Sequence, residues 1–478
     1  MRRFTFMLVW AALVAGAGGC TVGPDYHVPE IPVEGSYTAA GAANGAAEAN
    51  PAWWQVLKDK QLDGLIAAAA ENNLDLRQAE ARIREARAQR TVVAGAGAPA
   101  LNADGGYQRT RFSQNAAPYN AFDIPAFPWE FNGYEAGFDA QWELDLFGGN
   151  RRAVEASAAT VQATEEDRHA VLVALQGEVA RNYVALRGYQ RQRTLAQRNL
   201  DLQNQTLALT RDRVKNGVGS DLDVSRAAAL VAATAAEVPL YDRGEWQALH
   251  RLAVLTNQPL EKLTALREVT PIPLAPETVM TGVPAELLRR RPDIRRAERQ
   301  LAAATARVGV AEAELYPKLS LTGFFNLQSA STNDLIDWHS RAFSVGPAIS
   351  WPILEFGRLR GVIAVRNAQA DQALLSYEQT VQNAIQEVRD QMVTFSTERR
   401  RHTSLAEAVV ADRDALDLAG KLYAQGLADF LNVLDAERQL DQAENALARS
   451  EAQLDEALIG LYKALGGGWE NQEMAKPK

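Results

Sequence analysis

The chain has 478 residues, of which 47% are hydrophobic and 23% charged, a length and composition typical of two or three folded units. A formal net charge of −9 argues against an electrostatic surface for nucleic acid. A single cysteine and five widely separated histidines exclude an intrachain disulfide, a thiolate metal cage and paired-histidine metal ligation.

Residues 1–19 follow the pattern of a secretory signal peptide. Two arginines precede an apolar run over residues 4–17, which is shorter than a membrane-spanning helix requires. Small residues then lead to Cys20. This boundary resembles a bacterial lipobox, which implies a diacylglyceryl group and an acyl chain on Cys20 and, because Thr21 follows rather than aspartate, sorting to the outer membrane. We expect residues 20–61 to form a lipidated extended segment; the alternative is an ordinary signal peptide with an incidental cysteine.

The rest of the chain is duplicated. Residues 74–80 match residues 292–298 at an offset of 218, and residues 142–148 match residues 351–357 at an offset of 209. The difference between the offsets falls between the paired segments, where loops absorb length changes at little cost. The duplication divides the chain into a first repeat over residues 62–280, a second repeat over residues 281–468 and a C-terminal tail over residues 469–478.

Each repeat is expected to contain two β-strands. The four strands are predicted near residues 100–112, 131–145, 317–328 and 341–353. In the second of them, Phe138 and Trp142 alternate with Glu135, Asp139 and Glu143. Period-two alternation gives one apolar and one polar face, and the strand lengths suit tilted strands of a membrane barrel. A soluble sheet with one wet face is the alternative for any single strand, but four such strands behind a signal peptide favour the membrane.

A long helix is expected after each strand pair, over residues 150–215 and 359–425. The first region contains no proline and would form a rod on the order of 95–100 Å long. Gly217 and Gly219 predict a turn at the first tip, and Gly426 predicts a turn at the second. A helix of that length requires packed neighbours, because helical stability comes mainly from burying an apolar face.

The four predicted strands of one copy cannot form a closed membrane barrel by themselves. Four strands are too few to close a barrel, and an open sheet edge cannot face lipid. Several copies must therefore share one barrel, and the physical argument permits two, three or four. Glu135, Asp139 and Glu143 would then line the lumen, and Trp142 and Trp351 would lie at a membrane interface.

The chain resembles the TolC superfamily, in particular the lipoprotein branch of OprM- and NodT-type outer-membrane efflux factors. The motifs that carry the resemblance are Val22-Gly23-Pro24-Asp25-Tyr26, WELDLFG over residues 142–148, RRPDI over 290–294, YPKLSL over 316–321, WPI over 351–353, LNVLDA over 431–436 and ALGGGW over 464–469. The resemblance implies a mainly α fold with a membrane β portion. It implies a homotrimer with a twelve-stranded barrel, four strands per chain, on an α-helical coiled-coil periplasmic tunnel. It further implies a periplasmic adaptor and an inner-membrane pump of the resistance–nodulation–division type as partners.

The same resemblance places a gate at the periplasmic tip. It implies that Tyr423 supports the gate, that Leu431 forms an apolar constriction and that Asp435 forms an acidic ring. Three aspartates around one axis repel one another, so such a ring would respond to opening and to cations. The alternatives are a solvated helix-face charge for Asp435 and ordinary coiled-coil core for Leu431. Ala424 stands where some relatives carry arginine, and Asp221 and Asp223 at the first tip are weaker candidates for contacts with the second tip.

The remaining function classes are less consistent with the sequence. It contains no P-loop, nucleophile elbow or dinucleotide fingerprint, so we expect no enzymatic activity and no cofactor beyond the lipid on Cys20. A purely structural periplasmic lipoprotein would not need polar strand faces. The function implied is the exit channel of a tripartite efflux pump for small toxic compounds; the outer-membrane duct of a type I protein secretion system is the alternative.

Overall fold

A computed structural model describes residues 21–31, 52–113, 129–273, 275–276 and 290–470. The predicted signal peptide, the lipidation site at Cys20 and most of the C-terminal tail lie outside these residues. The chain forms two compact units. The first contains the N-terminal segment to Pro29 with Ile83–Ala163 and Glu298–Ser376, and the second contains Glu30–Arg82, Thr164–Ala297 and Tyr377–Lys478.

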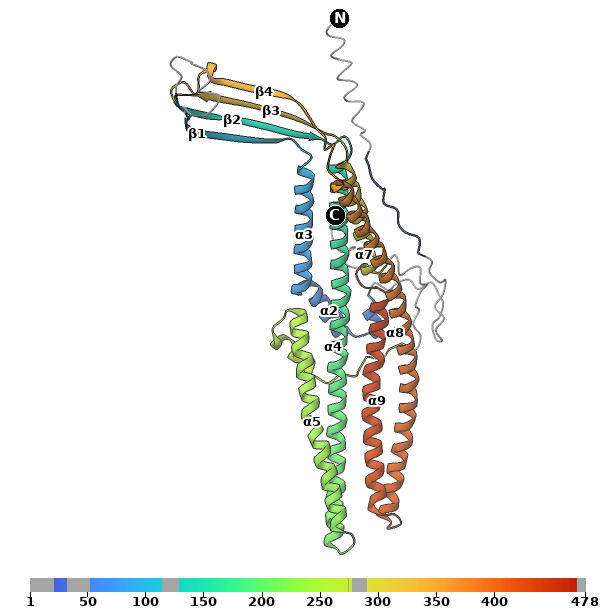
Figure 1. Cartoon of the computed structure of the whole chain (residues 1–478). Helices are drawn as coiled ribbons and strands as arrows, with labels where there is room; N and C mark the ends of the chain where they lie inside the picture. Colours follow the sequence, from blue (N-terminus) through green and yellow to red (C-terminus); the bar gives the residue numbers. More distant parts are fainter. Residues whose placement is uncertain (1–20, 32–51, 114–128, 274, 277–289, 471–478) are drawn as a thin grey trace. The chain divides into compact units, whose positions relative to one another are not determined.

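The first unit carries one antiparallel sheet of four strands in the order β1-β2-β3-β4 (Figure 1). The strands are β1 (Ala100–Arg111), β2 (Glu130–Leu144), β3 (Lys318–Ser329) and β4 (Arg341–Ser350). β1 and β2 come from the first repeat, and β3 and β4 come from the second. Among the described strands, the outward edges of β1 and β4 have no strand partner in the chain.

Two helices of 67 residues follow the strand pairs, α4 (Gly149–Lys215) and α8 (Arg358–Ala424). Both end in the same way. The N–H of Gly217 donates to Val214 O and that of Val218 to Arg213 O, and Gly426 and Leu427 repeat the pattern with Tyr423 and Leu422. Gly217 and Gly426 both have a φ of 75°, which glycine adopts without a Cβ penalty. Each long helix is therefore stopped by a glycine turn that sends the chain back alongside it.

The return helices are α5 (Asp221–Thr256) and α9 (Phe430–Ala464). The shorter elements are η1 (Trp53–Leu57), α2 (Lys60–Asn72), α3 (Leu74–Gly95), η2 (Leu260–Arg267), α7 (Pro292–Ala313) and η3 (Trp338–Ser340). In the second unit, Leu207 of α4, Ala227 of α5 and Phe430 of α9 share a buried apolar cluster. Within the described residues, no helix combines the length and apolarity that crossing a bilayer demands.

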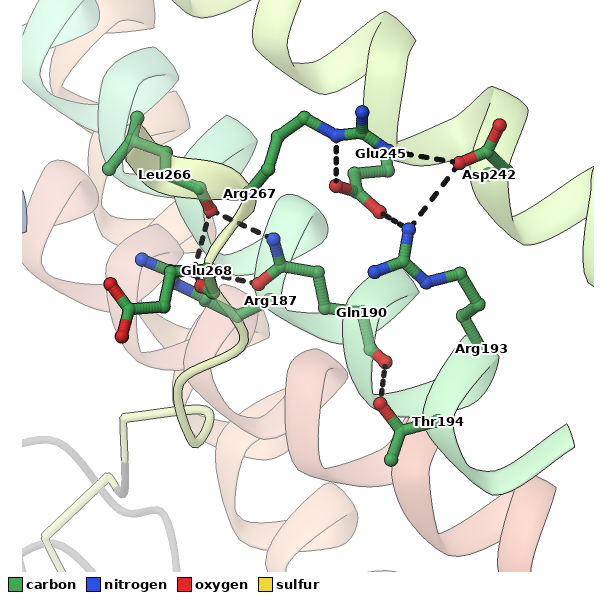
Figure 2. Close-up of polar contacts among 9 residues, drawn as sticks. All are labelled: Arg187, Gln190, Arg193, Thr194, Asp242, Glu245, Leu266, Arg267 and Glu268. Atoms are coloured by element: carbon green, nitrogen blue, oxygen red, sulfur yellow. Dashed lines mark hydrogen bonds and ion pairs between the residues drawn. The ribbon is translucent and has the colours of Figure 1, made fainter. Parts of the chain in front are cut away.

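Buried polar contacts fasten the segment after α5 onto α4 in the second unit (Figure 2). Arg187 of α4 is fully buried, and its Nη1 donates to the carbonyl oxygens of Leu266 and Glu268, each at 2.9 Å. The Glu245 carboxylate of α5 is also buried and pairs with Arg193 at 2.5 Å and with Arg267 at 3.0 Å. These hydrogen bonds and ion pairs hold η2 against α4.

Replacing Arg187 with methionine should lower the free energy of unfolding by about 2–4 kcal/mol. The apolar side chain fills much of the space but leaves buried carbonyls without their donor, which costs about 1–3 kcal/mol per group. Chaotrope unfolding of the detergent-solubilised protein, followed by tryptophan fluorescence, measures the change. Arg181→Met is the matched control, because Arg181 is partly exposed and its ion pair with Glu178 lies within its own helix. Equal unfolding midpoints for the two variants would contradict the role of Arg187.

Candidate functional site

The sheet has one apolar face that is exposed to the surroundings of the chain. Phe138 pairs with Phe325, and Phe325 pairs with Phe343, so three phenylalanines form a row across β2, β3 and β4. Their side chains are 43–70% exposed. In the next row, Ala140 pairs with Gly323, which in turn pairs with Val345. An exposed face of this kind requires an apolar environment.

The opposite face of the sheet carries the predicted lumen acids. Glu135, Asp139 and Glu143 are spaced four residues apart along β2, so their side chains share one face of the sheet. Asp139 accepts a hydrogen bond from Asn102 of β1 at 3.0 Å, and Glu143 pairs with Ser320 of β3. Phe324 lies on this face as an apolar exception beside Asp139. The acids are exposed or half-buried and do not pack into a soluble core.

The two tryptophans predicted to lie at a membrane interface are at the same end of the sheet and make equivalent hydrogen bonds. The indole Nε1 of Trp142 donates to Gly97 O at 3.0 Å, and that of Trp351 donates to Leu315 O at 3.0 Å. The two acceptors are related by the repeat offset of 218 residues. Each tryptophan thus ties the end of the second strand of its repeat to the turn that precedes the first strand. An exposed ring with an anchored N–H suits a membrane–water interface.

The N-terminal segment is fixed against the same end of the sheet. The N–H of Val22 donates to Phe147 O at 3.2 Å, and the buried Arg152 donates to Val22 O at 3.1 Å and to Asp25 at 2.6 Å. The hydrogen bond and charge of Arg152 lower the pKa of Asp25. This partnership could not be predicted from the sequence, because an arginine at the start of a helix can have many different partners.

The N-terminal segment also makes two close backbone approaches. A Cβ on Gly148 would lie 2.7 Å from the Thr21 side chain, and a Cβ on Gly309 would lie 3.0 Å from Val22 O. Glycine at these positions therefore gives the segment room to lie on the start of α4 and on α7.

The predicted gate residues lie at the second tip, in the second unit. Leu431 and Asp435 are exposed one turn apart on the same face of α9. Gln439 donates to Asp435 at 3.2 Å. Tyr423 is half-buried, and its ring lies 5.5 Å from that of Phe430. The structure therefore brings Leu431 and Asp435 to one exposed surface and places Tyr423 behind it.

The contact between the two tips involves a residue that sequence reasoning missed. Arg213, near the end of α4, donates to Tyr423 O at 3.1 Å, and its guanidinium lies 4.3 Å from the centre of the Tyr423 ring. Asp221 and Asp223 instead lie in the first turn of α5, where carboxylates favour the helix N-terminus. Among the described residues, no hydrogen bond or ion pair connects these two aspartates to the second tip.

Above the tips, α4 meets α9 through polar groups. Thr206 donates to Glu437 at 2.7 Å, and Asn199 donates to Asp441 at 2.6 Å. Burial raises the pKa of both carboxyl groups. Glu437 and Asp441 are four residues apart and therefore lie on one face of α9, a spacing that is visible in the sequence. The spacing alone does not show that α4 is the helix that packs against this face.

Arginines complete this polar contact one turn further along α9. Glu444 is buried and pairs with Arg198 of α4 at 2.9 Å and with Arg413 of α8 at 2.6 Å. The first and second repeats are therefore joined here by charged and hydrogen-bonded groups from three helices.

A sheet with one apolar and one acidic face, joined to long antiparallel helix pairs, defines a subunit of an outer-membrane channel. The sequence profile of the family described as outer membrane efflux protein matches residues 65–258 and 283–467, one segment in each repeat. The chain belongs to this family, and the predicted relationship to the TolC superfamily is confirmed.

Individual relatives match this chain over almost its whole length. The chain is 32% identical to outer membrane protein OprJ of Pseudomonas aeruginosa, covering 98% of this chain and 97% of that protein. It is also 32% identical to the solvent efflux pump outer membrane protein SrpC of Pseudomonas putida, covering 98% and 99%. The solved outer-membrane channel OprN matches with a TM-score of 0.87 and 38% identity, covering 94% of this chain and 100% of that one. The protein is thus an efflux channel of the outer membrane and not an enzyme.

Proposed function

We propose that three copies of this chain form the exit channel of a tripartite efflux pump. A periplasmic adaptor and an inner-membrane pump of the resistance–nodulation–division type would deliver small toxic compounds to it. The sheets would close into one twelve-stranded barrel, and the long helices would form the periplasmic tunnel. The observation that carries the proposal is the single sheet with two open edges, one apolar face and one acidic face. Such a sheet satisfies its edges in lipid only by joining copies of itself.

The acidic face of β2 supports a water-filled passage that few cargoes would contact specifically. Selectivity would then lie in the pump, and the channel would serve compounds of differing chemistry. The relative SrpC is named for solvent efflux, which supports small apolar compounds as one cargo class.

Two measurements test the proposed function. A deletion strain should become more sensitive to several unrelated antibiotics, dyes or metals and should recover on complementation. The purified protein in a planar bilayer should give discrete conductance steps. Unchanged sensitivity together with loss of a secreted protein from the medium would replace efflux with protein secretion.

We propose that Cys20 carries the lipid anchor, because the segment that begins at Thr21 is fixed against the end of β2 and the start of α4. An anchor attached to the preceding residue would enter the membrane beside the strand ends. Mass spectrometry of the mature N-terminal peptide should show a diacylglyceryl group and an acyl chain. Cys20→Ser should lack both and should remain an uncleaved precursor, whereas an unmodified wild-type peptide would contradict the proposal.

The proposed lumen position of Glu135, Asp139 and Glu143 predicts a cation-selective pore. Asp139→Asn should reduce the cation-to-anion permeability ratio by roughly twofold, because it removes one fixed negative charge per copy from a confined wall. Reversal potentials across a salt gradient measure this ratio. Gln141→Glu, on the same face, should raise it. If neither variant changes the reversal potential, these side chains do not line the conducting path.

We propose that the gate lies at the second tip, with Leu431 as the constriction, Asp435 as the acidic ring and Tyr423 as their support. Opening would move the second tip away from the first, so the contact between Arg213 and Tyr423 would hold the closed state. The polar contacts of Glu437 and Asp441 with α4 suit surfaces that separate, since each group exchanges a hydrogen-bond partner for water.

A further inference from the structure

The charged residues of the sheet are divided between its two faces. Besides the acids of β2, the polar face carries Asp104 of β1 and Lys318 of β3. Among the described strands, the apolar face with Phe138, Phe325 and Phe343 has charged residues at one end only. That end lies at the hairpin loops, away from the helices that precede and follow the strands (Figure 1). The residues are Arg109 and Arg111 of β1, Glu130 of β2 and Arg341 of β4.

The charged residues of β1 lie just beyond an aromatic belt. Tyr107 pairs with Tyr134 on the apolar face, and the two rings are 4.8 Å apart. Trp142, at the other end of β2, is eight residues from Tyr134. Eight residues span about 27 Å along a strand and about 21 Å across a membrane at a tilt of about 40°, and the apolar band of a membrane barrel is about 25 Å high. Arg109 and Arg111, which follow Tyr107 on the same face, therefore lie at the level of the lipid headgroups.

The two arginines of β1 share one carboxylate. Arg109 Nη2 donates to Glu130 Oε2 at 2.9 Å, and Arg111 Nη1 donates to Glu130 Oε1 at 2.8 Å. The two arginine side chains remain 66% and 75% exposed. One carboxylate neutralises one guanidinium, so the group keeps a positive charge, and each guanidinium has further N–H groups that can donate. Two guanidinium groups held side by side match the oxygen atoms of a phosphate.

Arg341 presents a second cationic group on the same face, at the start of β4. Its guanidinium lies 4.0 Å from the centre of the Trp338 ring, and it donates to Trp338 O at 2.5 Å. Within the described ranges, Arg341 forms no ion pair with a carboxylate. The Trp338 side chain is 66% exposed. An exposed indole beside a guanidinium suits the boundary between acyl chains and charged headgroups.

The position of these arginines restricts the kind of partner that they can bind. They project from the apolar face, which meets the acyl chains of the membrane, so their partner is an anion that is itself held in the lipid layer. Proteins of this family extend from the outer membrane into the periplasm. The helices are the periplasmic part, so the hairpin loops lie on the outer side. The partner therefore belongs to the outer leaflet and carries its negative charge in the headgroup.

We propose that Arg109, Arg111 and Arg341 bind the phosphate groups of lipid A in the outer leaflet. The pair on β1 binds one phosphate and Arg341 binds another, with the Trp338 ring against the neighbouring acyl chains. Glu130 keeps the pair aligned when no lipid is bound. This inference rests on the proposed barrel, in which the apolar face contacts lipid, and adds the chemistry of the lipid that it contacts.

Native mass spectrometry of the purified protein in detergent tests the proposal. The protein is titrated with bisphosphorylated lipid A, with lipid A from which both phosphates have been removed, and with inorganic phosphate. EDTA is present so that divalent cations do not bridge phosphate to acidic side chains. The test variant combines Arg109→Gln, Arg111→Gln and Arg341→Gln. The matched control combines Arg84→Gln, Arg90→Gln and Arg211→Gln, which remove the same charge from exposed positions of α3 and α4.

The wild type and the control should bind bisphosphorylated lipid A at least about tenfold more tightly than the phosphate-free lipid, because each contact is a charge-assisted hydrogen bond. The test variant should bind the two lipids equally. If the test variant does not assemble, Arg341→Gln alone and Arg109→Gln with Arg111→Gln should each reduce the preference by about threefold or more.

Three results would overturn the proposal. They are equal binding of the two lipids by the wild type, an unchanged preference in the variants of the three arginines, and binding of inorganic phosphate as tight as that of lipid A. A trimer with normal conductance steps would in each case leave the exit channel intact. A monomer would overturn the proposed channel as well.

Discussion

Phe325→Lys should remove the protein from the outer membrane almost completely. Phe325 lies in the middle of β3 on the apolar face, between Phe138 and Phe343. A lysine on the lipid side near the middle of a bilayer costs about 2–4 kcal/mol, and three copies would raise this to roughly 6–12 kcal/mol for the barrel. That cost is comparable to the whole stability of an ordinary domain. Immunodetection in sucrose-gradient membrane fractions measures the effect.

Phe324→Lys is the matched control for this experiment. It makes the same chemical change one residue earlier, on the face that carries Asp139. Because that face is proposed to contact water, the variant should reach the outer membrane in near-normal amounts and should complement the deletion strain. Equal losses for the two variants would mean that the two faces do not differ in environment, and the barrel would have to be abandoned.

Arg213→Met should raise the resting conductance of the purified channel by about tenfold. The substitution removes a charged hydrogen bond to Tyr423 O and a cation–π contact with the Tyr423 ring. Together these contribute on the order of 1–3 kcal/mol per copy, and about 1.4 kcal/mol corresponds to a factor of ten in an equilibrium constant. Planar-bilayer recordings at low voltage measure the change.

Arg211→Met provides the control for Arg213→Met, since Arg211 is exposed on the same turn of α4. It should leave the conductance unchanged. Asp435→Ala should also raise the resting conductance, because the alanine side chain is smaller than that of aspartate and would widen the proposed ring. Unchanged conductance in Asp435→Ala would remove that residue from the gate, and unchanged conductance in Arg213→Met would show that the two tips separate without breaking this contact.

The predicted fold class is confirmed, and the features that made it predictable are local. Alternation at period two marks β2 and β3, the absence of proline marks α4, and glycine marks both tips. Because the chain is duplicated, each element is predicted twice, once from each repeat. The strand near residues 100–112 has a weak alternation pattern, because glycines and alanines take the place of large apolar side chains in β1. Its partner β2 defines it in the structure.

The contacts across the chain could not be predicted in this way. Arg213 reaches Tyr423 over 210 positions, and Arg152 reaches Asp25 over 127. The sequence does not distinguish one arginine of a long helix from another. Which of them contacts a distant residue depends on how the helices pack. The equivalent hydrogen bonds of Trp142 and Trp351 were likewise hidden, because the acceptors are backbone carbonyls that carry no sequence signal.

The mass of the native particle tests the central claim most directly. Purified protein in detergent, measured by native mass spectrometry or by light scattering corrected for detergent, should contain three chains and keep that mass on dilution. Four strands with open edges on β1 and β4 leave no stable monomer in an apolar medium. A monomer that remains folded and stable in detergent would contradict the account.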